Sequence, residues 1–180
     1  MKVLGISGSL RKDSYNTMAL RAAQKLAPAG IEVTIADISQ IPLYNEDVRT
    51  AGEPAAVSAL KAQLRAADAV LIVTPEYNFS VPGVLKNTLD WMSRPPEAPF
   101  DGKVVAVMGA ATGQVGTARA QYHLRQMLVM LNSFTVNKPE VFINHCASKF
   151  NAQGELTDEA AAKLIGELLL SLQKLKARLG

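Results

Sequence analysis

The stretch AVLIVTPEYNFSVPGVLKNTLDWM, residues 69–92, decides the fold class of this chain. It opens with an apolar run, residues 69–74, that reads as a strand buried on both faces. A loop with two prolines and a glycine follows, and apolar residues then recur at helical spacing over residues 84–92. A buried strand, a shaped loop and a helix are the repeating unit of a parallel α/β sheet.

The same unit recurs along the chain. Further apolar runs predict short strands at residues 3–6, 31–35, 104–108 and 141–143. Apolar residues at helical spacing predict further helices over residues 17–26, 55–67, 116–131 and 157–179. Strands that are continuously apolar are buried on both faces, so we expect helices on both sides of one parallel sheet.

Two other segments are expected to be structural only. The last helix should start near Thr157, and its core-facing stripe should be formed by Leu164, Leu168, Leu172 and Leu175. Segment 41–54 is polar and holds two prolines and a glycine, which is typical of a surface loop.

Length and composition limit the class of protein. A chain of 180 residues has room for one core, so we expect a single domain over residues 1–180. No run approaches the roughly 20 apolar residues of a membrane-spanning helix, and the N-terminus lacks the apolar core of a signal peptide, so we expect no membrane partner. The lone cysteine, Cys146, excludes internal disulfides and paired-cysteine metal sites, which favours a cytoplasmic protein without a metal.

The net charge of +3 does not indicate a nucleic-acid partner. The basic residues are scattered, and the one dense group, Lys174, Lys176 and Arg178, ends the last helix, where cations complement the helix dipole. No aromatic residue is interleaved with this group for base stacking, so we expect no nucleic acid.

The first of three informative loops is GSLRKDSYN, residues 8–16. Ligands of parallel sheets bind beyond the carboxyl ends of the strands, where the strand order reverses. This loop offers two serine hydroxyls, the Arg11 guanidinium, the Asn16 amide and the free N–H groups of a helix start, which suit a phosphate monoester. It lacks the GxxxxGK[ST] and GxGxxG patterns of ATPases and dinucleotide folds. Taken alone, it is also consistent with an ordinary polar turn and helix cap.

The other two loops suit a flat ligand. Residues 75–83, PEYNFSVPG, supply Tyr77 and Phe79 as flat apolar surface, although a simple proline-bounded turn is an equal alternative. Residues 109–116, GAATGQVG, allow close approach of the backbone, although glycine turns are also common there for steric reasons. With the strand order 2-1-3-4-5 the three loops converge, which predicts one site for a phosphate at one end and a ring at the other.

These motifs resemble the NADPH-dependent FMN reductase family, a group that includes bacterial quinone and chromate reductases. The similarity is carried by GSLRKDSYN, by TPEYNFSVPGVLKNTLDW and by the glycine turn followed by ARAQYHLRQ. It implies a flavodoxin-like three-layer α/β sandwich with a five-stranded parallel sheet in the order 2-1-3-4-5. It further implies bound FMN, NADPH or NADH as co-substrate, and a homodimer or homotetramer.

The resemblance also implies a set of FMN-binding residues. The phosphate segment holds Ser9, Arg11, Ser14 and Asn16, with Tyr15 and Thr17 beside them. The isoalloxazine is lined by Pro75, Glu76, Tyr77 and Asn78. The opposite side is bordered by Gly109, Ala110, Ala111 and Gly113. No side chain is assigned a catalytic role, because the cofactor itself carries hydride transfer.

Several other reactive residues are given structural interpretations. His123 and Arg125 are expected at exposed or hydrogen-bonded positions of a helix. His145 and Cys146 are adjacent, and adjacent residues of a strand point to opposite faces, so we expect no Cys–His pair. Glu76 is expected to shape the pocket rather than to act as an acid or base.

The function that follows is an FMN-dependent NAD(P)H oxidoreductase. Its small-molecule electron acceptor would be a quinone, chromate or free flavin, reduced by ping-pong hydride transfer through bound FMN. A flavodoxin-type electron carrier is one alternative, although such carriers tend to be acidic and this chain is basic. A flavin-based redox sensor is the other.

Overall fold

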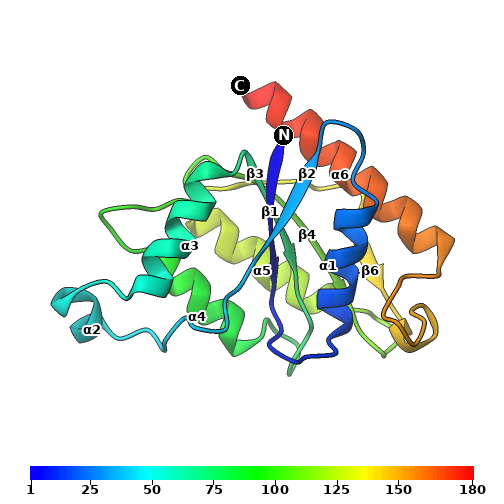
Figure 1. Cartoon of the computed structure of the whole chain (residues 1–180), viewed down its shortest axis with the longest axis horizontal. Helices are drawn as coiled ribbons and strands as arrows, with labels where there is room; N and C mark the ends of the chain where they lie inside the picture. Colours follow the sequence, from blue (N-terminus) through cyan, green and yellow to red (C-terminus); the bar gives the residue numbers. More distant parts are fainter.

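A parallel sheet organises the protein, seen in a computed structural model that describes residues 1–180 (Figure 1). In spatial order it contains β2 (Glu32–Ala36), β1 (Lys2–Ser7), β3 (Ala69–Val73) and β4 (Val104–Ala110). Two short strands share the next position: β5 (Phe134–Thr135) pairs with the start of β4, and β6 (Val141–Ile143) pairs with its end. The predicted α/β class and strand order are confirmed, although the sequence did not indicate β5.

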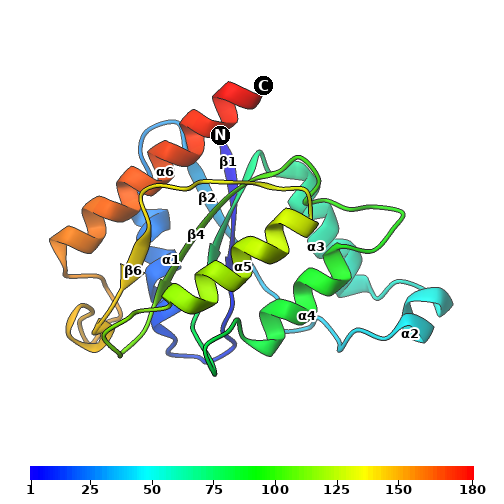
Figure 2. The ribbon, with the colours of Figure 1, turned by 180° about the vertical axis from the view of Figure 1, so that it is seen from behind.

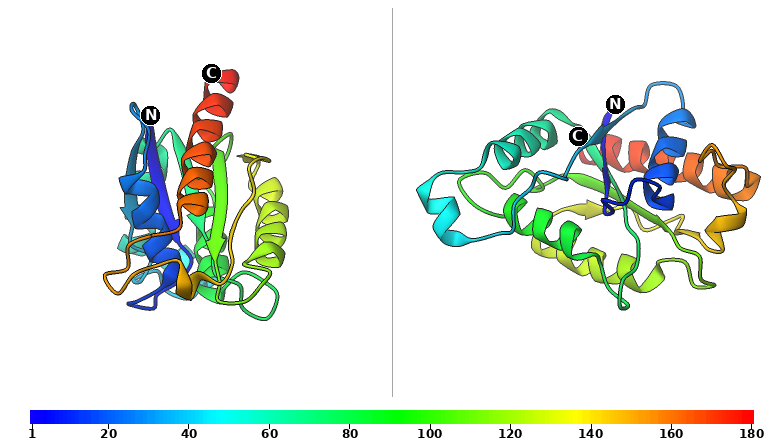
Figure 3. Two further views of the ribbon diagram at one scale, coloured as in Figure 1. Left: turned by 90° about the vertical axis from the view of Figure 1, so that its right-hand side faces the viewer. Right: turned by 60° about the horizontal axis from the view of Figure 1, so that its bottom comes forward.

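Helices cover both faces of the sheet and complete the three layers (Figures 2 and 3). One face carries α1 (Tyr15–Lys25) and α6 (Glu159–Leu179), and the other carries α3 (Ala55–Ala66), α4 (Gly83–Met92) and α5 (Ala118–Met130). Alternate residues of a strand point to opposite faces of the sheet, so Leu71 belongs to the first apolar core and Ile72 to the second. Each core contains 23 buried residues.

The second strand differs from its prediction. It was expected to be buried on both faces, but Glu32, Thr34 and Ile35 are exposed. The physical reason is its place at the edge of the sheet, where β1 is its only neighbour. An apolar run of this length therefore marks a strand without telling whether both of its faces are covered.

The last helix is also shifted from its expected pattern. Asp158 caps it, because the Asp158 carboxylate accepts the N–H of Ala161 at 2.7 Å. Leu168 and Leu172 of the predicted stripe are buried and Leu175 packs against the core, but Leu164 is 36% exposed. The core positions on that side are taken instead by Ala161, Ile165 and Leu169.

Segment 41–54 was wrongly expected to be a loop throughout, because it contains α2 (Glu46–Ala51). Asn45 starts this helix by accepting the N–H of Asp47 at 2.8 Å, and the helix projects from the body with no buried residue (Figure 1). The segment is held at its start by Trp91, whose indole N–H donates to the Pro42 carbonyl at 2.8 Å.

The carboxyl ends of β1, β3 and β4 meet at one edge, at the bottom of Figure 1 and turned forward in the right panel of Figure 3. The loops that lead to α1, α4 and α5 leave the sheet at this edge. A parallel sheet of this type places its ligand site here. None of the helices has the length and apolar character that crossing a bilayer requires.

Candidate functional site

A cavity of about 200 Å³ opens where the three loops meet. All three loops form its wall, together with one residue that follows β6. Its lining consists of Ser9, Arg11, Ser14, Tyr15, Asn16, Pro75, Glu76, Tyr77, Ala110, Ala111, Thr112 and Cys146. The structure thus brings together residues that are more than 100 positions apart in the sequence.

Four of the predicted ligand residues lie outside this lining, namely Thr17, Asn78, Gly109 and Gly113. Gly109 has a packing role, since a Cβ there would lie 2.1 Å from Thr117 Oγ1 and 2.3 Å from the Thr74 carbonyl oxygen. Its small size allows the start of α5 to approach the sheet.

Thr17 and Gly113 hold neighbouring segments in place. The hydroxyl oxygens of Thr17 and Ser7 are 2.8 Å apart, which joins α1 to the end of β1. The Gly113 carbonyl accepts the N–H of His145 at 3.3 Å, which joins the third loop to the segment after β6.

The first loop forms an anion-binding end of the cavity. Ser14 caps α1 by accepting the N–H of Asn16 at 3.2 Å, so the N–H groups of Tyr15 and Thr17 in the same turn stay available to a ligand. The positive end of the helix dipole and the exposed Arg11 guanidinium add favourable charge. A phosphate fits this set of donors.

Asn16 has a different role from the one expected. Its side-chain amide donates to the Ala110 carbonyl at 2.9 Å and accepts the Ala110 N–H at 2.8 Å, and both bonds are buried. The side chain therefore joins the first loop to the end of β4 instead of pointing a free amide at a phosphate. Residues 94 positions apart are fixed relative to each other by this pair of bonds.

The second loop makes a tight turn beside the cavity. Tyr77 and Ser80 exchange two backbone hydrogen bonds of 3.0 Å. Between them, Asn78 and Phe79 both have left-handed backbones, with φ of 51° and 63°. Tyr77 and Phe79 are 53% and 65% exposed, and Tyr77 lines the cavity, so its ring offers flat apolar surface to a ligand.

Glu76 is turned toward the start of α5. Its carboxylate accepts the Ala120 N–H at 3.1 Å and pairs with Arg119 at 3.2 Å, and only 9% of its side chain is exposed. A carboxylate at a helix N-terminus is stabilised by the helix dipole. This agrees with the expectation that Glu76 shapes the pocket.

Cys146 lies in the cavity wall, which the sequence analysis missed. Its N–H donates to the Ala111 carbonyl at 3.1 Å, and burial raises the pKa of the thiol. The expected strand geometry of His145 and Cys146 is wrong, because His145 has a left-handed backbone (φ 44°) at the start of the 3₁₀ turn η1 (Cys146–Ser148). The position of Cys146 in the sequence could have indicated this, because Cys146 follows a predicted strand that ends at the same edge of the sheet as the three loops.

The two remaining helical candidates make hydrogen bonds, as expected. His123 Nδ1 lies 3.0 Å from the Ser80 hydroxyl, and Arg125 donates to the Val136 carbonyl at 2.9 Å. Neither lines the cavity. The chain contains no group of three His, Cys, Asp or Glu side chains placed to hold a metal ion.

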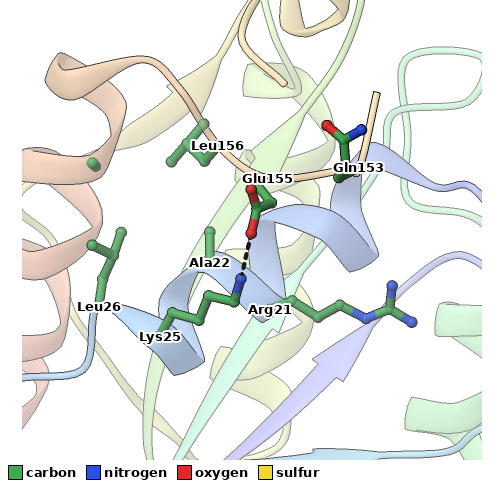
Figure 4. Close-up of a pocket in the computed structure, with 9 residues that line it drawn as sticks. Arg21, Ala22, Lys25, Leu26, Gln153, Glu155 and Leu156 are labelled. Atoms are coloured by element: carbon green, nitrogen blue, oxygen red, sulfur yellow. Dashed lines mark hydrogen bonds and ion pairs between the residues drawn. The ribbon is translucent and has the colours of Figure 1, made fainter. Parts of the chain in front are cut away.

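A larger hollow, of about 370 Å³, lies elsewhere, between α1, the start of α6 and the segment before it (Figure 4). An ion pair of 2.9 Å between Lys25 and Glu155 crosses it. Both side chains are more than half exposed. This hollow lies away from the sheet edge where the three loops converge, and the hydrogen-bond donors of those loops do not line it.

The fold and the cavity together define a flavodoxin-like protein with a site for a phosphate-bearing planar ligand. The donors of the first loop fit an anion, and Pro75, Tyr77, Ala110 and Ala111 give the adjoining wall an apolar character. FMN has both of these parts, so the residues present fit that cofactor.

Comparison with known proteins identifies the family. Residues 1–148 match the family described as NADPH-dependent FMN reductase. An NAD(P)H-dependent FMN reductase from Pseudomonas aeruginosa is 58% identical, with 96% of this chain and 94% of that protein covered. A quinone reductase from Escherichia coli K12 is 48% identical, with 93% and 92% covered. The chain therefore belongs to the NADPH-dependent FMN reductase family.

A solved structure agrees with this assignment. The flavoenzyme NAD(P)H:(acceptor) oxidoreductase FerB from Paracoccus denitrificans superposes with a TM-score of 0.91 at 37% identity, covering 99% of this chain and 98% of that one. Membership of the family confirms that the protein is an oxidoreductase enzyme, with FMN as cofactor and NAD(P)H as electron donor.

Proposed function

We propose that the protein is an NAD(P)H:quinone oxidoreductase that holds FMN in the cavity between the three loops. The observation that carries this proposal is that one cavity combines a helix start suited to binding an anion with an apolar wall. Relatives of similar length are named as a quinone reductase and as a 2-hydroxy-1,4-benzoquinone reductase, which supports a quinone as the acceptor.

The proposed roles of the residues follow from their contacts. Ser9, Arg11, Ser14 and the free N–H groups of α1 would hold the phosphate, while Pro75, Tyr77 and Ala111 would border the ring. When bound, FMN accepts a hydride from the nicotinamide and passes electrons to the acceptor. The chain supplies placement and electrostatics, and no side chain of the site is required as a nucleophile.

The shape of the cavity supports a shared place for donor and acceptor. Its volume of about 200 Å³ is below the roughly 300–1,000 Å³ that clefts and cavities for small molecules commonly have, so a ligand as large as a flavin would keep part of its surface exposed. We therefore propose that NAD(P)H and the acceptor bind in turn at the open side, which gives ping-pong kinetics. Stacking on a flat ring selects planarity more than detailed shape, so free flavin is proposed as a further acceptor. Chromate, a small tetrahedral anion that cannot stack, is also proposed, because the open side admits a small solute to the reduced flavin, and it would be reduced by successive one-electron transfers.

Steady-state kinetics test this proposal. Initial rates are measured with FMN-loaded protein over a grid of NADPH and benzoquinone concentrations, with FMN-free protein as the control. Parallel double-reciprocal lines are expected. Intersecting lines would contradict the shared place, and a failure of NADPH to reduce the bound flavin would instead favour the electron-carrier alternative.

We also propose that the protein is a cytoplasmic homodimer or homotetramer. Tyr122, Val129 and Met130 on α5 and Phe134 beside it are 50%, 75%, 74% and 45% exposed. Apolar residues gathered on one side of a molecule are typical of contact surfaces. Light scattering coupled to gel filtration is expected to give two or four times the mass of 19.3 kDa, and a monomer would contradict the proposal.

A further inference from the structure

The turn at residues 77–80 has a backbone that one of its two central residues, Phe79, does not favour. Asn78 and Phe79 are consecutive non-glycine residues in the left-handed region, where a Cβ crowds the backbone. The turn is also exposed beside the cavity, since Tyr77 and Phe79 are each more than half exposed. Besides the two backbone hydrogen bonds between Tyr77 and Ser80, contacts from outside the turn are therefore expected to help hold it in one position.

Those contacts come from the first two turns of α5. The guanidinium of Arg119 pairs with the Glu76 carboxylate at 3.2 Å and lies 4.2 Å from the centroid of the Phe79 ring. Two further contacts are the bond from the Ala120 N–H to Glu76, at 3.1 Å, and the contact of 3.0 Å between His123 and the Ser80 hydroxyl. Arg119 therefore contacts a residue before Tyr77 and a residue after it in the sequence, and Tyr77 itself lines the cavity.

We propose that Arg119 is a positioning residue that fixes the turn at residues 77–80, and with it the Tyr77 wall of the cavity. The inference rests on the proposed flavin site. Arg119 does not line the cavity, so it acts through Glu76 and Phe79 rather than on the ligand. Arg119 lies in the first turn of α5, which begins directly after the third loop. The same residue therefore fixes the second loop relative to the third, and both loops form walls of the cavity.

A role in global stability is not expected of Arg119. Its own side chain is 47% exposed, and the Glu76 carboxylate, which is 9% exposed, keeps the Ala120 N–H as a partner when Arg119 is removed. The stacking of its guanidinium over Phe79 adds a local restraint, because a cation over an aromatic face is attracted by the ring. The effect should therefore be confined to the turn and to the ligand that the turn borders.

The test compares Arg119→Ala and Arg119→Lys with a matched control, Arg65→Ala. Arg65 pairs with Glu97 and is equally exposed, at 47%, but lies away from the cavity. Limited digestion of the full chain with chymotrypsin reports directly on the turn, because Tyr77 and Phe79 are exposed aromatic cleavage sites. FMN affinity by fluorescence titration and the KM and kcat for NADPH at saturating FMN complete the set.

In Arg119→Ala, cleavage at residues 77–79 should be faster and the FMN Kd should rise about fivefold, as expected for one lost contact of this type. The kcat at saturating FMN should fall while the melting temperature stays at that of Arg65→Ala. Arg119→Lys should recover only part of the loss, since lysine restores the charge beside Glu76 but not the planar stack on Phe79.

Unchanged cleavage and unchanged FMN affinity in Arg119→Ala would overturn the proposal. Equal effects in Arg65→Ala would overturn it as well. The stacking role would be overturned if Arg119→Lys recovered fully and Phe79→Leu had no effect. The proposed flavin site is tested separately by Arg11→Ala, in which FMN affinity should fall without faster cleavage at the turn. A loss in neither Arg11→Ala nor Arg119→Ala would count against the site itself.

Discussion

Replacing Asn16 by alanine should destabilise the protein strongly, because two buried hydrogen bonds join this side chain to the Ala110 backbone. They are 2.9 Å and 2.8 Å long, and both are buried. Removing one partner of a buried hydrogen bond costs about 1–3 kcal/mol for each group left unsatisfied. We therefore expect the free energy of unfolding to fall by about 2–4 kcal/mol in Asn16→Ala.

Thermal and urea unfolding of the FMN-free protein measure this change. For a chain of this size, a loss of 2–4 kcal/mol corresponds to a melting temperature lower by about 5–15 °C. FMN affinity should fall as well, since the same bonds hold the first loop against the end of β4. Adding saturating FMN should recover part of the lost stability, because a ligand that binds only the folded state stabilises it.

Asn16→Asp separates hydrogen bonding from packing. Aspartate has nearly the same shape and still accepts the Ala110 N–H, but an ionised carboxylate cannot donate to the Ala110 carbonyl. It should therefore be no more stable than Asn16→Ala at neutral pH. Asn137→Ala, at an exposed position, is the control. If Asn16→Ala lost no more than about 0.5 kcal/mol, the range of ordinary surface substitutions, or if Asn16→Asp matched the wild type, the reasoning would be refuted.

Four further predictions concern single residues at the site or beside it. Arg11→Ala should weaken FMN binding about ten- to a hundredfold, because a charge-assisted bond to phosphate contributes roughly 1.5–3 kcal/mol, and equal affinity by fluorescence titration would remove Arg11 from the site. Gly109→Ala should lower the free energy of unfolding by about 1–3 kcal/mol or more, because its Cβ would lie 2.1 Å from Thr117 Oγ1, and a wild-type urea midpoint would contradict this. Cys146 should react with iodoacetamide more slowly than a free thiol at neutral pH, and its reactivity should increase only as the pH rises toward its raised pKa. Rapid labelling at pH 7 would show that burial does not suppress the thiolate. Cys146→Ser should keep NADPH-dependent turnover close to wild type, and loss of activity with FMN still bound would point to a redox-active thiol.

The central strands could be predicted from the sequence because they are buried on both faces. Apolar runs such as residues 69–74 follow from that burial, and their order follows from the general rule for parallel sheets. The two-residue strand β5 gave no such signal, since its pattern of burial is exposed then intermediate. Helix α2 was missed for the same reason, because it buries nothing and begins from a local cap at Asn45.

The three loops could be predicted, but the roles of individual residues within them could not. Side-chain type suggested that Asn16 offers an amide to a ligand, whereas its bonds to Ala110 depend on a partner 94 positions away. Gly109 has a tertiary reason of the same kind, set by Thr117 and Thr74. Cys146 reaches the cavity because the chain turns sharply at His145, and a left-handed backbone at a histidine has no sequence signature.

The central claim is that FMN binds in the cavity between the three loops, and a crystal structure of the protein with FMN tests it most directly. The account predicts the phosphate against Ser9, Arg11 and the first turn of α1, with the ring between the turn at residues 77–80 and Ala111. Density for the flavin in the hollow between α1 and α6, or at any other place away from the carboxyl ends of β1, β3 and β4, would contradict it.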